Sequence, residues 1–323
     1  MFHSVFIEVS GICNARCPYC YTGSRHGDHV QNMNPFMSAQ LFQDVTARLR
    51  ELNFIGKDSC VHLYNWGEPF LNPEIKDILS HLHGIGNKFV ISTNAGFFPK
   101  LPRSLFKNLS EIVISMPGFR QASYDKIHGL RLDKVLLNVE RIIDTVGNRR
   151  VNVCMHAYKF NTAEIDDARA YFRKRGVLFT VYPAFFNDYN QTKAYLTGSL
   201  PEAFLARAMD ELILEGQPAL LASRPEDYVC PQFDMLTVDE KGQLVTCCLA
   251  PKTSADYAYG TPFELTGEEI LERKVTRNLC KECSALKIDY WVHASPTYSS
   301  DAFYRLPGGR LRTGLWHLKK FFS

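Results

Sequence analysis

Apolar residues along the first 185 positions follow two alternating spacings, which predict strands and helices in turn. Short runs rich in Val, Ile and Phe, bounded by polar residues or glycine, are candidate strands. Stretches with an apolar residue at every third or fourth position are candidate helices with one buried face. We expect strands over 2–9, 61–65, 88–93, 111–116, 151–158 and 177–182. We expect helices over 38–52, 73–83, 133–146 and 161–172.

Two of these helices begin at residues that favour a helix start. Ser38 precedes the apolar face of Leu41 and Val45, and a serine side chain there accepts a backbone N–H of the first turn. Asn161 and Glu164 have the spacing of a capping box. Alternation of this kind predicts an α/β fold with parallel strands and outer helices.

The pattern changes after Gly216, where the strand-helix alternation ends. Residues 233–238 and 243–247 are two short apolar runs around a four-residue turn that contains Gly242, which predicts a β-hairpin. This last third carries five of the ten cysteines. We therefore expect a core domain over 1–216 and a smaller domain over 217–323.

Composition and charge exclude several classes of protein. The 46% of hydrophobic residues is typical of a globular protein, and the formal charge of +3 is too small to indicate a nucleic-acid partner. No apolar run is long enough for a transmembrane helix, and the first residues lack the pattern of a signal peptide. Ten cysteines in such a chain point to the cytoplasm and to metal ligands or catalytic groups rather than disulfides.

Three cysteines follow the first predicted strand. Cys13, Cys17 and Cys20 have the spacing C-x3-C-x2-C, with Tyr19 before the last of them. Three thiolates in one loop can hold three irons of a [4Fe–4S] cube and leave the fourth iron open to a small molecule. A zinc knuckle or structural cysteines are the alternative, but no fourth ligand stands nearby at zinc-site spacing.

This loop resembles the cysteine motif of the radical S-adenosylmethionine (radical SAM) superfamily. The resemblance implies a partial (β/α)6 barrel whose site lies at the carboxyl ends of the strands, as in other parallel barrels. It also implies that SAM binds the open iron. An electron from a donor such as flavodoxin or ferredoxin then cleaves SAM to a 5′-deoxyadenosyl radical, which takes a hydrogen atom from the substrate.

A second motif follows the second strand, where Trp66 precedes Gly67, Glu68 and Pro69. It resembles the Gly-Gly-Glu motif of the same family in its Gly-Glu-Pro form, which accepts hydrogen bonds from the amino group of SAM. Trp66 stands at the first glycine position, which is a departure from the family pattern.

Further cofactor contacts are implied by position in the family. They are Tyr19 in the cysteine loop, Ser92 and Asn94 at the end of the third strand, Ser115 at the end of the fourth, and Arg131 before the long helix. Each has an alternative: Asn94 suits an ordinary turn, and Arg131 suits a solvated helix start.

The fifth strand has one polar face and one apolar face. Asn152, Cys154 and His156 alternate with apolar residues, so they share one side of the strand. In a barrel whose apolar side packs under the helices, that polar side faces the interior. Cys154 and His156 are therefore candidates for the substrate cavity, with buried core residues as the alternative.

A second cysteine group lies in the last third of the chain. Cys230, Cys247 or Cys248, Cys280 and Cys283 supply four thiolates, which could hold zinc or a [4Fe–4S] cube. Behind a radical SAM core, this group resembles a Twitch or truncated SPASM extension with one auxiliary cube.

The family pattern Gly-x4-Cys, counted from Gly242, selects Cys247 as the ligand. Cys248 would then point to the other face of its strand. It is either a hydrogen-atom donor to a substrate radical or a small buried hydrophobe.

These features together predict a radical SAM oxidoreductase or epimerase. The first cysteine is residue 13, which leaves no room for a leader-binding domain of the kind found in many peptide-modifying relatives. We therefore expect a sugar-like or aminocyclitol-like small molecule as substrate. A short peptide is the alternative, and a non-catalytic electron-transfer protein is a third.

The segment 305–323 has five Lys or Arg and no acid, interleaved with Trp316, Phe321 and Phe322. It could contact an anionic membrane surface or a phosphorylated substrate, or it could be a C-terminal helix that docks on the domain.

Overall fold

The computed structural model describes residues 2–25 and 35–294. The basic segment 305–323 and its predicted helix lie outside these residues.

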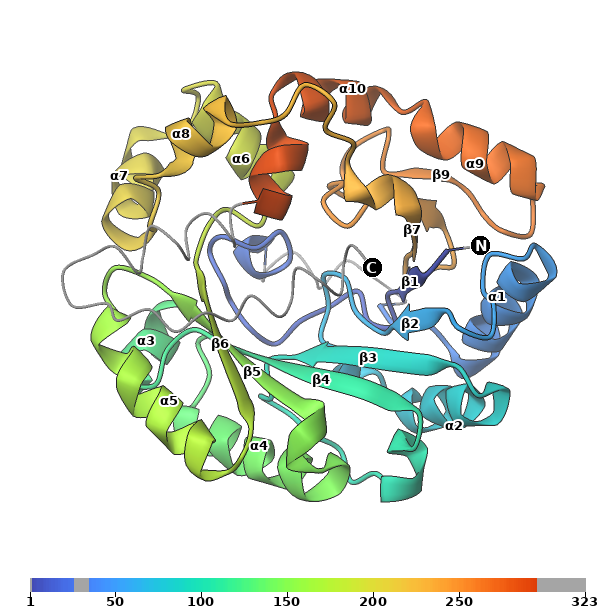
Figure 1. The fold of residues 1–323 in the computed structure, drawn as a ribbon, viewed down its shortest axis with the longest axis horizontal. Coiled ribbons are helices and arrows are strands. Elements are labelled where there is room, and N and C mark those ends of the chain that lie inside the picture. The colour runs from blue at the N-terminus through green and yellow to red at the C-terminus, as the bar shows by residue number, and fades with distance from the viewer. Residues whose placement is uncertain (1, 26–34, 295–323) are drawn as a thin grey trace.

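A single sheet organises the described chain. Its strand order is β6-β5-β4-β3-β2-β1-β7-β8-β9, and every pairing from β6 to β7 is parallel. The alternation of strands and helices expected from the sequence is confirmed, and Figure 1 shows the strands β1 to β6 side by side between the helices. The strands are β1 Ser4–Ile7, β2 Cys60–His62, β3 Lys88–Thr93, β4 Leu109–Met116, β5 Val151–Ala157, β6 Leu178–Pro183, β7 Met235–Val238, β8 Leu244–Val245 and β9 Ala258–Gly260.

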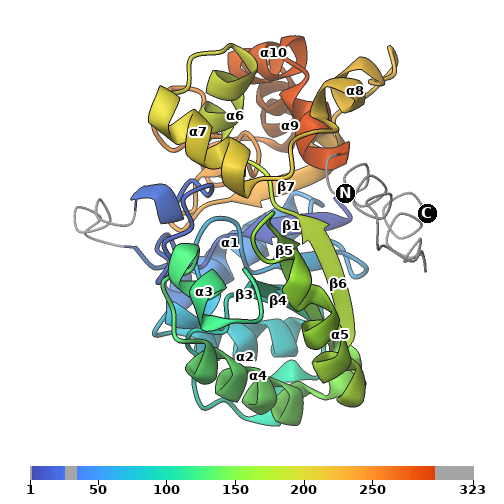
Figure 2. The ribbon, with the colours of Figure 1, turned by 90° about the vertical axis from the view of Figure 1, so that its left-hand side faces the viewer.

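The helices divide into two sets. Figures 1 and 2 show α1, α2, α4 and α5 along the outside of the parallel strands, and α6, α7, α8 and α10 grouped at one end of the molecule. Their bounds are α1 Ala39–Glu51, α2 Ile75–Ile85, α3 Gln121–Lys126, α4 Leu132–Val146, α5 Ile165–Lys174, α6 Tyr189–Leu196, α7 Glu202–Glu211, α8 Gln217–Ala222, α9 Gly267–Val275 and α10 Asn278–Ala285.

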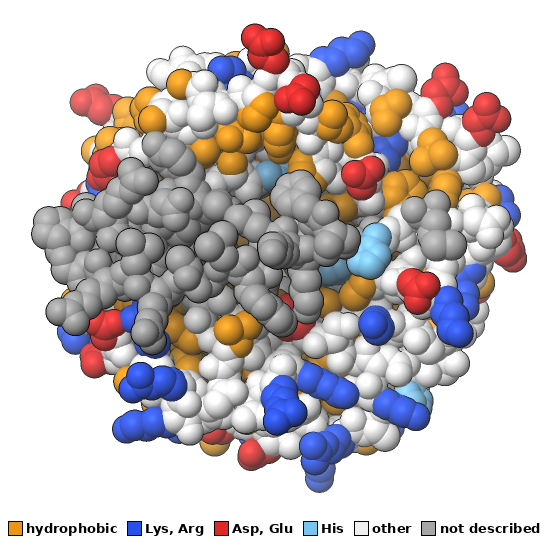
Figure 3. All heavy atoms as spheres, viewed as in Figure 1, with side chains coloured by type: hydrophobic (Ala, Val, Ile, Leu, Met, Phe, Trp, Pro, Cys, Tyr) orange, Lys and Arg blue, Asp and Glu red, His pale blue; other side chains and the backbone are white. Residues whose placement is uncertain are grey.

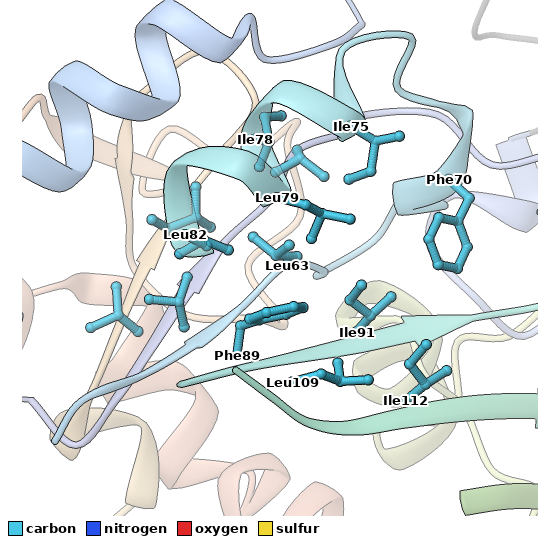
Figure 4. Close-up of a cluster of buried hydrophobic side chains, with 14 of the residues drawn as sticks. Leu63, Phe70, Ile75, Ile78, Leu79, Leu82, Phe89, Ile91, Leu109 and Ile112 are labelled. Carbon is cyan, nitrogen blue, oxygen red and sulfur yellow. The ribbon is translucent and has the colours of Figure 1, made fainter. Parts of the chain in front are cut away.

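The main core lies between the outer helices and the sheet. Helix α2 turns its apolar face, which includes Ile78, Leu79 and Leu82, toward Leu63 and Phe89 of the strand layer (Figure 4). All five side chains are fully buried. Burial of each such side chain contributes about 1.5–3 kcal/mol, so this face holds the helix on the sheet.

The two predicted helix starts have different outcomes. Ser38 caps α1 by accepting a hydrogen bond from the Leu41 N–H, as expected. The capping box at Asn161 is wrong, because its side chain makes no cap and instead donates to the carbonyls of Pro117 and His156. Glu164 accepts from the Phe119 N–H and the Ser123 hydroxyl, so both side chains connect loops that are distant in sequence.

The predicted hairpin forms, and it extends the main sheet. Strands β7 and β8 pair antiparallel around the turn at Asp239, while β7 pairs in parallel with β1. The last third of the chain therefore lies against the first strand, which leads into the cysteine loop. Helix α9 begins with a complete capping box between Thr266 and Glu269.

The surface is mixed in character. Lys and Arg side chains gather along the lower margin of the face in Figure 3, and hydrophobic side chains gather in its upper half. Within the described residues, no helix combines the length and apolar character needed to cross a bilayer.

Candidate functional site

The loop after β1 brings Cys13, Cys17 and Cys20 to the carboxyl end of the parallel strands. All three are free thiols, and all three line one cavity of about 260 Å³. The other side chains that line it include Tyr19, Tyr64, Gly67, Glu68, Ser92, Thr93, Asn94, Ser115, His128, His156, Tyr158, Phe185 and Asn187. The cavity therefore collects residues from the ends of several strands, as the parallel topology predicts.

A larger hollow of about 360 Å³ lies at the opposite ends of the strands. It is lined by segments that precede β4 and β5, among them Arg103, Lys107, Arg149 and Arg150, and it contains no cysteine. The thiols and the carboxylate of the candidate site are all in the smaller cavity, so we locate the chemistry there.

The cysteine loop is held against the turn after β2. A β-carbon on Gly67 would lie 1.7 Å from the Ser10 carbonyl oxygen, so only glycine fits. The Glu68 N–H donates to the Ile12 carbonyl at 2.8 Å, which adds a direct bond between the two segments. Gly67 is thus required by the approach of two protein backbones.

Glu68 lies at the wall of the cavity and ties the turn to the end of β3. Its carboxylate accepts hydrogen bonds from the Thr93 hydroxyl at 2.7 Å, the Asn94 N–H at 2.8 Å and the Phe70 N–H at 3.2 Å. The side chain is 2% exposed, and burial raises the pKa of Glu68 to about 7. Asn94, in turn, donates from its amide to the Cys13 sulfur at 3.4 Å.

The cysteine loop supplies three soft sulfur ligands to the cavity. Among the described residues, no three His, Cys, Asp or Glu side chains meet at a single metal position. In a cube each thiolate binds its own iron, so the sulfurs need not converge on one point. Burial raises the pKa of the Cys13 thiol to about 12, and the Ala15 N–H and the Asn94 amide both point to its sulfur.

Two histidines face the cavity in their neutral form. Burial lowers the pKa of His128 to about 3 and that of His156 to about 4, and His156 makes a smaller contribution to the shift of His128. His128 is 3% exposed, and its Nδ1 has no hydrogen-bond partner within the described protein. Neutral imidazoles can donate or accept a hydrogen bond from a bound molecule.

Tyr19 is held in the cavity wall by an acid from α7. Its hydroxyl donates to the Glu211 carboxylate at 2.8 Å, and its ring packs against Tyr158, Phe186 and Phe204. Burial raises the pKa of Tyr19 above its usual range.

Several predicted site residues lie outside the cavity lining. Pro69 is buried at the start of a short 3-10 helix, and Arg131 is exposed and paired with Asp133 at 2.7 Å. Cys154 is buried on β5, next to Thr180 of β6, whereas His156 two residues later does line the cavity. Cys248 is also outside the lining, and it packs against the buried cluster that contains Trp66 and Tyr21.

The second cysteine group is brought together from three segments. Cys230 precedes β7, Cys247 and Cys248 follow β8, and Cys280 and Cys283 lie one turn apart on α10. Cys247, Cys248 and Cys283 pack against one buried cluster. Burial, with smaller contributions from other thiols of the group, raises the pKa values of Cys230, Cys248, Cys280 and Cys283. Within the described residues they are all free thiols.

An aromatic cluster lies between the two cysteine groups. Trp66 and Tyr21 are in contact, with ring centroids 5.4 Å apart, in a buried cluster that also holds Tyr189. Cys20 of the first group and Cys247, Cys248 and Cys283 of the second pack against this same cluster. The tryptophan that departs from the family's glycine therefore fills the space between the two groups.

Sequence reasoning missed a buried ion cluster beside the loop. Glu8 directly follows β1 and is fully buried, accepts hydrogen bonds from the N–H groups of Trp66 and Gly67, and pairs with Lys252 at 3.4 Å. Lys252 also pairs with Glu240 at 2.6 Å. Burial raises the pKa of Glu8 to about 7, although Lys252 opposes the shift. The sequence signal that could have revealed this cluster is Glu8 itself, the one acidic residue in the predicted strand 2–9.

His128 and Lys274 were missed as well. His128 follows a short helix and carries no pattern of its own, and Lys274 reads as an exposed charge in the last turn of a helix. Only the packing shows that both are buried.

Comparison with known proteins gives one family and a set of similar folds. Residues 7–172 match the Radical SAM superfamily model. No curated protein sequence matches the chain.

Solved structures with a similar fold share little sequence with the chain. SuiB of Streptococcus suis has a TM-score of 0.58 at 14% identity, and the match covers 86% of this chain and 67% of SuiB. SuiB has also been solved with its precursor peptide SuiA, where the chain spans 66% of its length. The structure of anSMEcpe with bound AdoMet has a TM-score of 0.55 at 14% identity, with 93% and 99% covered. BtrN in complex with AdoMet and 2-DOIA scores 0.45 at 13% identity, with 94% and 90% covered.

Proposed function

The chain belongs to the radical SAM superfamily, and we propose on that premise that Cys13, Cys17 and Cys20 hold a [4Fe–4S] cube at which SAM is reductively cleaved. We propose further that the enzyme removes a hydrogen atom from a small sugar-like or aminocyclitol-like substrate. The outcome is oxidation or epimerisation of that carbon.

One shared cavity carries the proposal. The three thiols line the same space as Glu68, Asn94 and polar side chains from β3, β4 and β5. The donor set suits a cube, since the three sulfurs are soft ligands and each would bind its own iron. Bound together, the cube and SAM supply a 5′-deoxyadenosyl radical able to take a hydrogen atom from an unreactive carbon.

The chain's own residues hold this site in place. Asn94 and Ala15 direct N–H groups at the Cys13 sulfur, and such bonds tune a cluster ligand. Gly67 and Glu68 lock the turn onto the cysteine loop. Ser92, Ser115 and His156 offer hydroxyl and imidazole groups at the strand ends, where SAM or a hydroxyl-rich substrate would bind.

We propose that the second cysteine group holds an auxiliary [4Fe–4S] cube through Cys230, Cys247, Cys280 and Cys283. Their positions support this ligand set, since Cys280 and Cys283 lie one turn apart on α10, and Cys247 and Cys283 pack against the same buried cluster. Such a cube supplies a one-electron acceptor, which suits oxidation. Cys248, which follows Cys247, is the candidate thiol that would donate a hydrogen atom in an epimerisation. The sulfur radical left on Cys248 would be returned to a thiol by one electron from the reduced auxiliary cube and one proton from solvent.

A short peptide is the second candidate substrate. SuiB, which has a similar fold, was solved with its precursor peptide SuiA. The cavity of about 260 Å³ favours a small group, but a single side chain of a peptide would also fit.

Anaerobic reconstitution with iron and sulfide, followed by SAM and dithionite, tests the proposal. We expect about eight irons per chain from two cubes and formation of 5′-deoxyadenosine. A variant with Cys13, Cys17 and Cys20 all replaced by Ala should retain about four irons and form no 5′-deoxyadenosine. Absence of 5′-deoxyadenosine from the fully loaded wild type would overturn the catalytic proposal.

Small-molecule and peptide substrates can then be separated by isotope transfer. Deuterium from a labelled polyol or aminocyclitol in 5′-deoxyadenosine supports the first candidate, and deuterium from a labelled peptide supports the second. Cys248→Ala should abolish product formation in an epimerase but leave oxidation intact.

A further inference from the structure

Lys274 is a buried lysine placed against the second cysteine group. It lies in the last turn of α9 and is 2% exposed, although lysine is among the residues most rarely buried. Its Nζ donates one long hydrogen bond, 3.4 Å, to the Thr246 carbonyl. Thr246 directly precedes Cys247, so this bond places the ammonium beside the second cysteine group. Burial lowers the pKa of Lys274, and the thiols of Cys247, Cys280, Cys230 and Cys248 oppose that shift.

No acid in the described part of the chain forms an ion pair with Lys274. Asp256, an acid of the same region, pairs with Arg277 at 2.8 Å instead. A buried ammonium with one weak acceptor is costly by several kcal/mol unless a negative charge compensates it. The sulfurs are the groups at hand that could supply this charge, and they would do so as thiolates bound to a metal centre.

A [4Fe–4S] cube with four thiolate ligands is such a centre. Four thiolates carry more negative charge than the cluster core carries positive charge, so the assembly as a whole is anionic. Burial makes the interaction strong, because little water lies between the charges to screen them.

We propose that Lys274 is the charge-compensating residue of the second cysteine group and raises the reduction potential of the cube held there. This inference rests on the auxiliary cube of the proposed function. Reduction adds one negative charge to the cube, so a fixed positive charge nearby stabilises the reduced form more than the oxidised form. Lys274 thereby makes the cube a better electron acceptor.

Lys281 offers a matched control. It lies on α10 between Cys280 and Cys283, yet it is exposed and donates no side-chain hydrogen bond among the described residues. Water and salt screen an exposed charge, so its effect on the cube should be small.

The potential is best measured with the first cube removed. In the chain with Cys13, Cys17 and Cys20 replaced by Ala, any remaining [4Fe–4S] signal belongs to the second group. The chain is reconstituted anaerobically, its iron and zinc are counted, and its midpoint potential is taken from a dithionite titration followed by electron paramagnetic resonance. Lys274→Met, Lys274→Arg and Lys281→Met are compared in this background.

We expect Lys274→Met to lower the equilibrium constant for reduction at least about tenfold, which is about 59 mV for a one-electron couple. Lys274→Arg should change this equilibrium constant less than about twofold, because it keeps the positive charge. Lys281→Met should also change it less than about twofold, because water and salt already screen the exposed Lys281 charge. Loss of iron from Lys274→Met with retention in Lys274→Arg would also support compensation by charge.

Three results would overturn the inference. They are an unchanged potential in a fully loaded Lys274→Met, equal shifts in Lys274→Met and Lys281→Met, and zinc or no metal in place of iron at the second group. The last would also remove the auxiliary cube. SAM cleavage by the first cube is scored separately, by 5′-deoxyadenosine from the chain with its loop cysteines intact.

Discussion

Replacing Gly67 with Ala should displace the cysteine loop. The added β-carbon would lie 1.7 Å from the Ser10 carbonyl oxygen and 2.9 Å from the Ile12 carbonyl oxygen, where real contacts are not closer than 3.0 Å. The two backbones must therefore separate by about 1.3 Å, the difference between 1.7 and 3.0 Å. Neither neighbour is a side chain that could rotate away.

The separation also breaks hydrogen bonds. The Glu68 N–H bond to Ile12 is 2.8 Å long, and the Gly67 N–H bond to the buried Glu8 carboxylate is also 2.8 Å. Each buried group left without a partner costs about 1–3 kcal/mol. Together with overpacking of about 1–3 kcal/mol, we expect Gly67→Ala to lose about 3 kcal/mol or more of unfolding free energy.

Urea unfolding followed by circular dichroism, with iron counted in parallel, measures both effects. Gly84→Ala is the control, because Gly84 lies within α2 and nothing approaches its added β-carbon within 4 Å. That change should stabilise the chain by about 0.5–1 kcal/mol, since alanine favours a helix. Wild-type stability and iron content in Gly67→Ala would refute the claim that backbone contact requires this glycine.

Three further predictions concern the cavity and the second group. Burial raises the pKa of Glu68 to about 7, so the folded chain keeps a proton that the unfolded chain loses near pH 4.5. Glu68 should therefore make the unfolding free energy of the metal-free chain fall by about 1.4 kcal/mol per pH unit across this window. Glu8, whose pKa burial also raises to about 7, adds a slope of the same sign. Glu68→Gln should remove the Glu68 share and leave that of Glu8, and a slope as steep as that of the wild type would contradict the assignment. Arg131→Ala should change SAM affinity in equilibrium binding less than about twofold, because the side chain is exposed outside the cavity and its ion pair is weak, and a tenfold loss would show that it reaches the cofactor. Cys247→Ala should remove the second set of about four irons and Cys248→Ala should keep it, and the reverse iron counts would exchange their roles.

Local patterns predicted the strands, the outer helices and the cysteine motif because each depends on neighbours in sequence. Ser38 caps α1 through a bond to a residue three positions away, and the apolar face of α2 follows from helical periodicity. The same reasoning failed at Asn161, whose polar groups bond to the loop after β4 and to the end of β5. An asparagine side chain can cap a helix or bond to distant backbone groups, and in this fold Asn161 does the second.

The amino-acid sequence by itself determined the α/β alternation and the family. The spacing of apolar residues predicts the alternation, and the spacing of the first three cysteines indicates the family. Only the tertiary structure decided which charges are buried. Glu8 and Lys274 have no unusual neighbours in sequence. Glu8 is buried where β7 pairs with β1 and brings the last third of the chain against the first strand, and Lys274 is buried where α9 lies against Thr246, which follows β8. Burial removes water from a charged side chain, so its free energy depends on the groups packed around it. Those groups are distant in sequence, and local sequence patterns do not identify them.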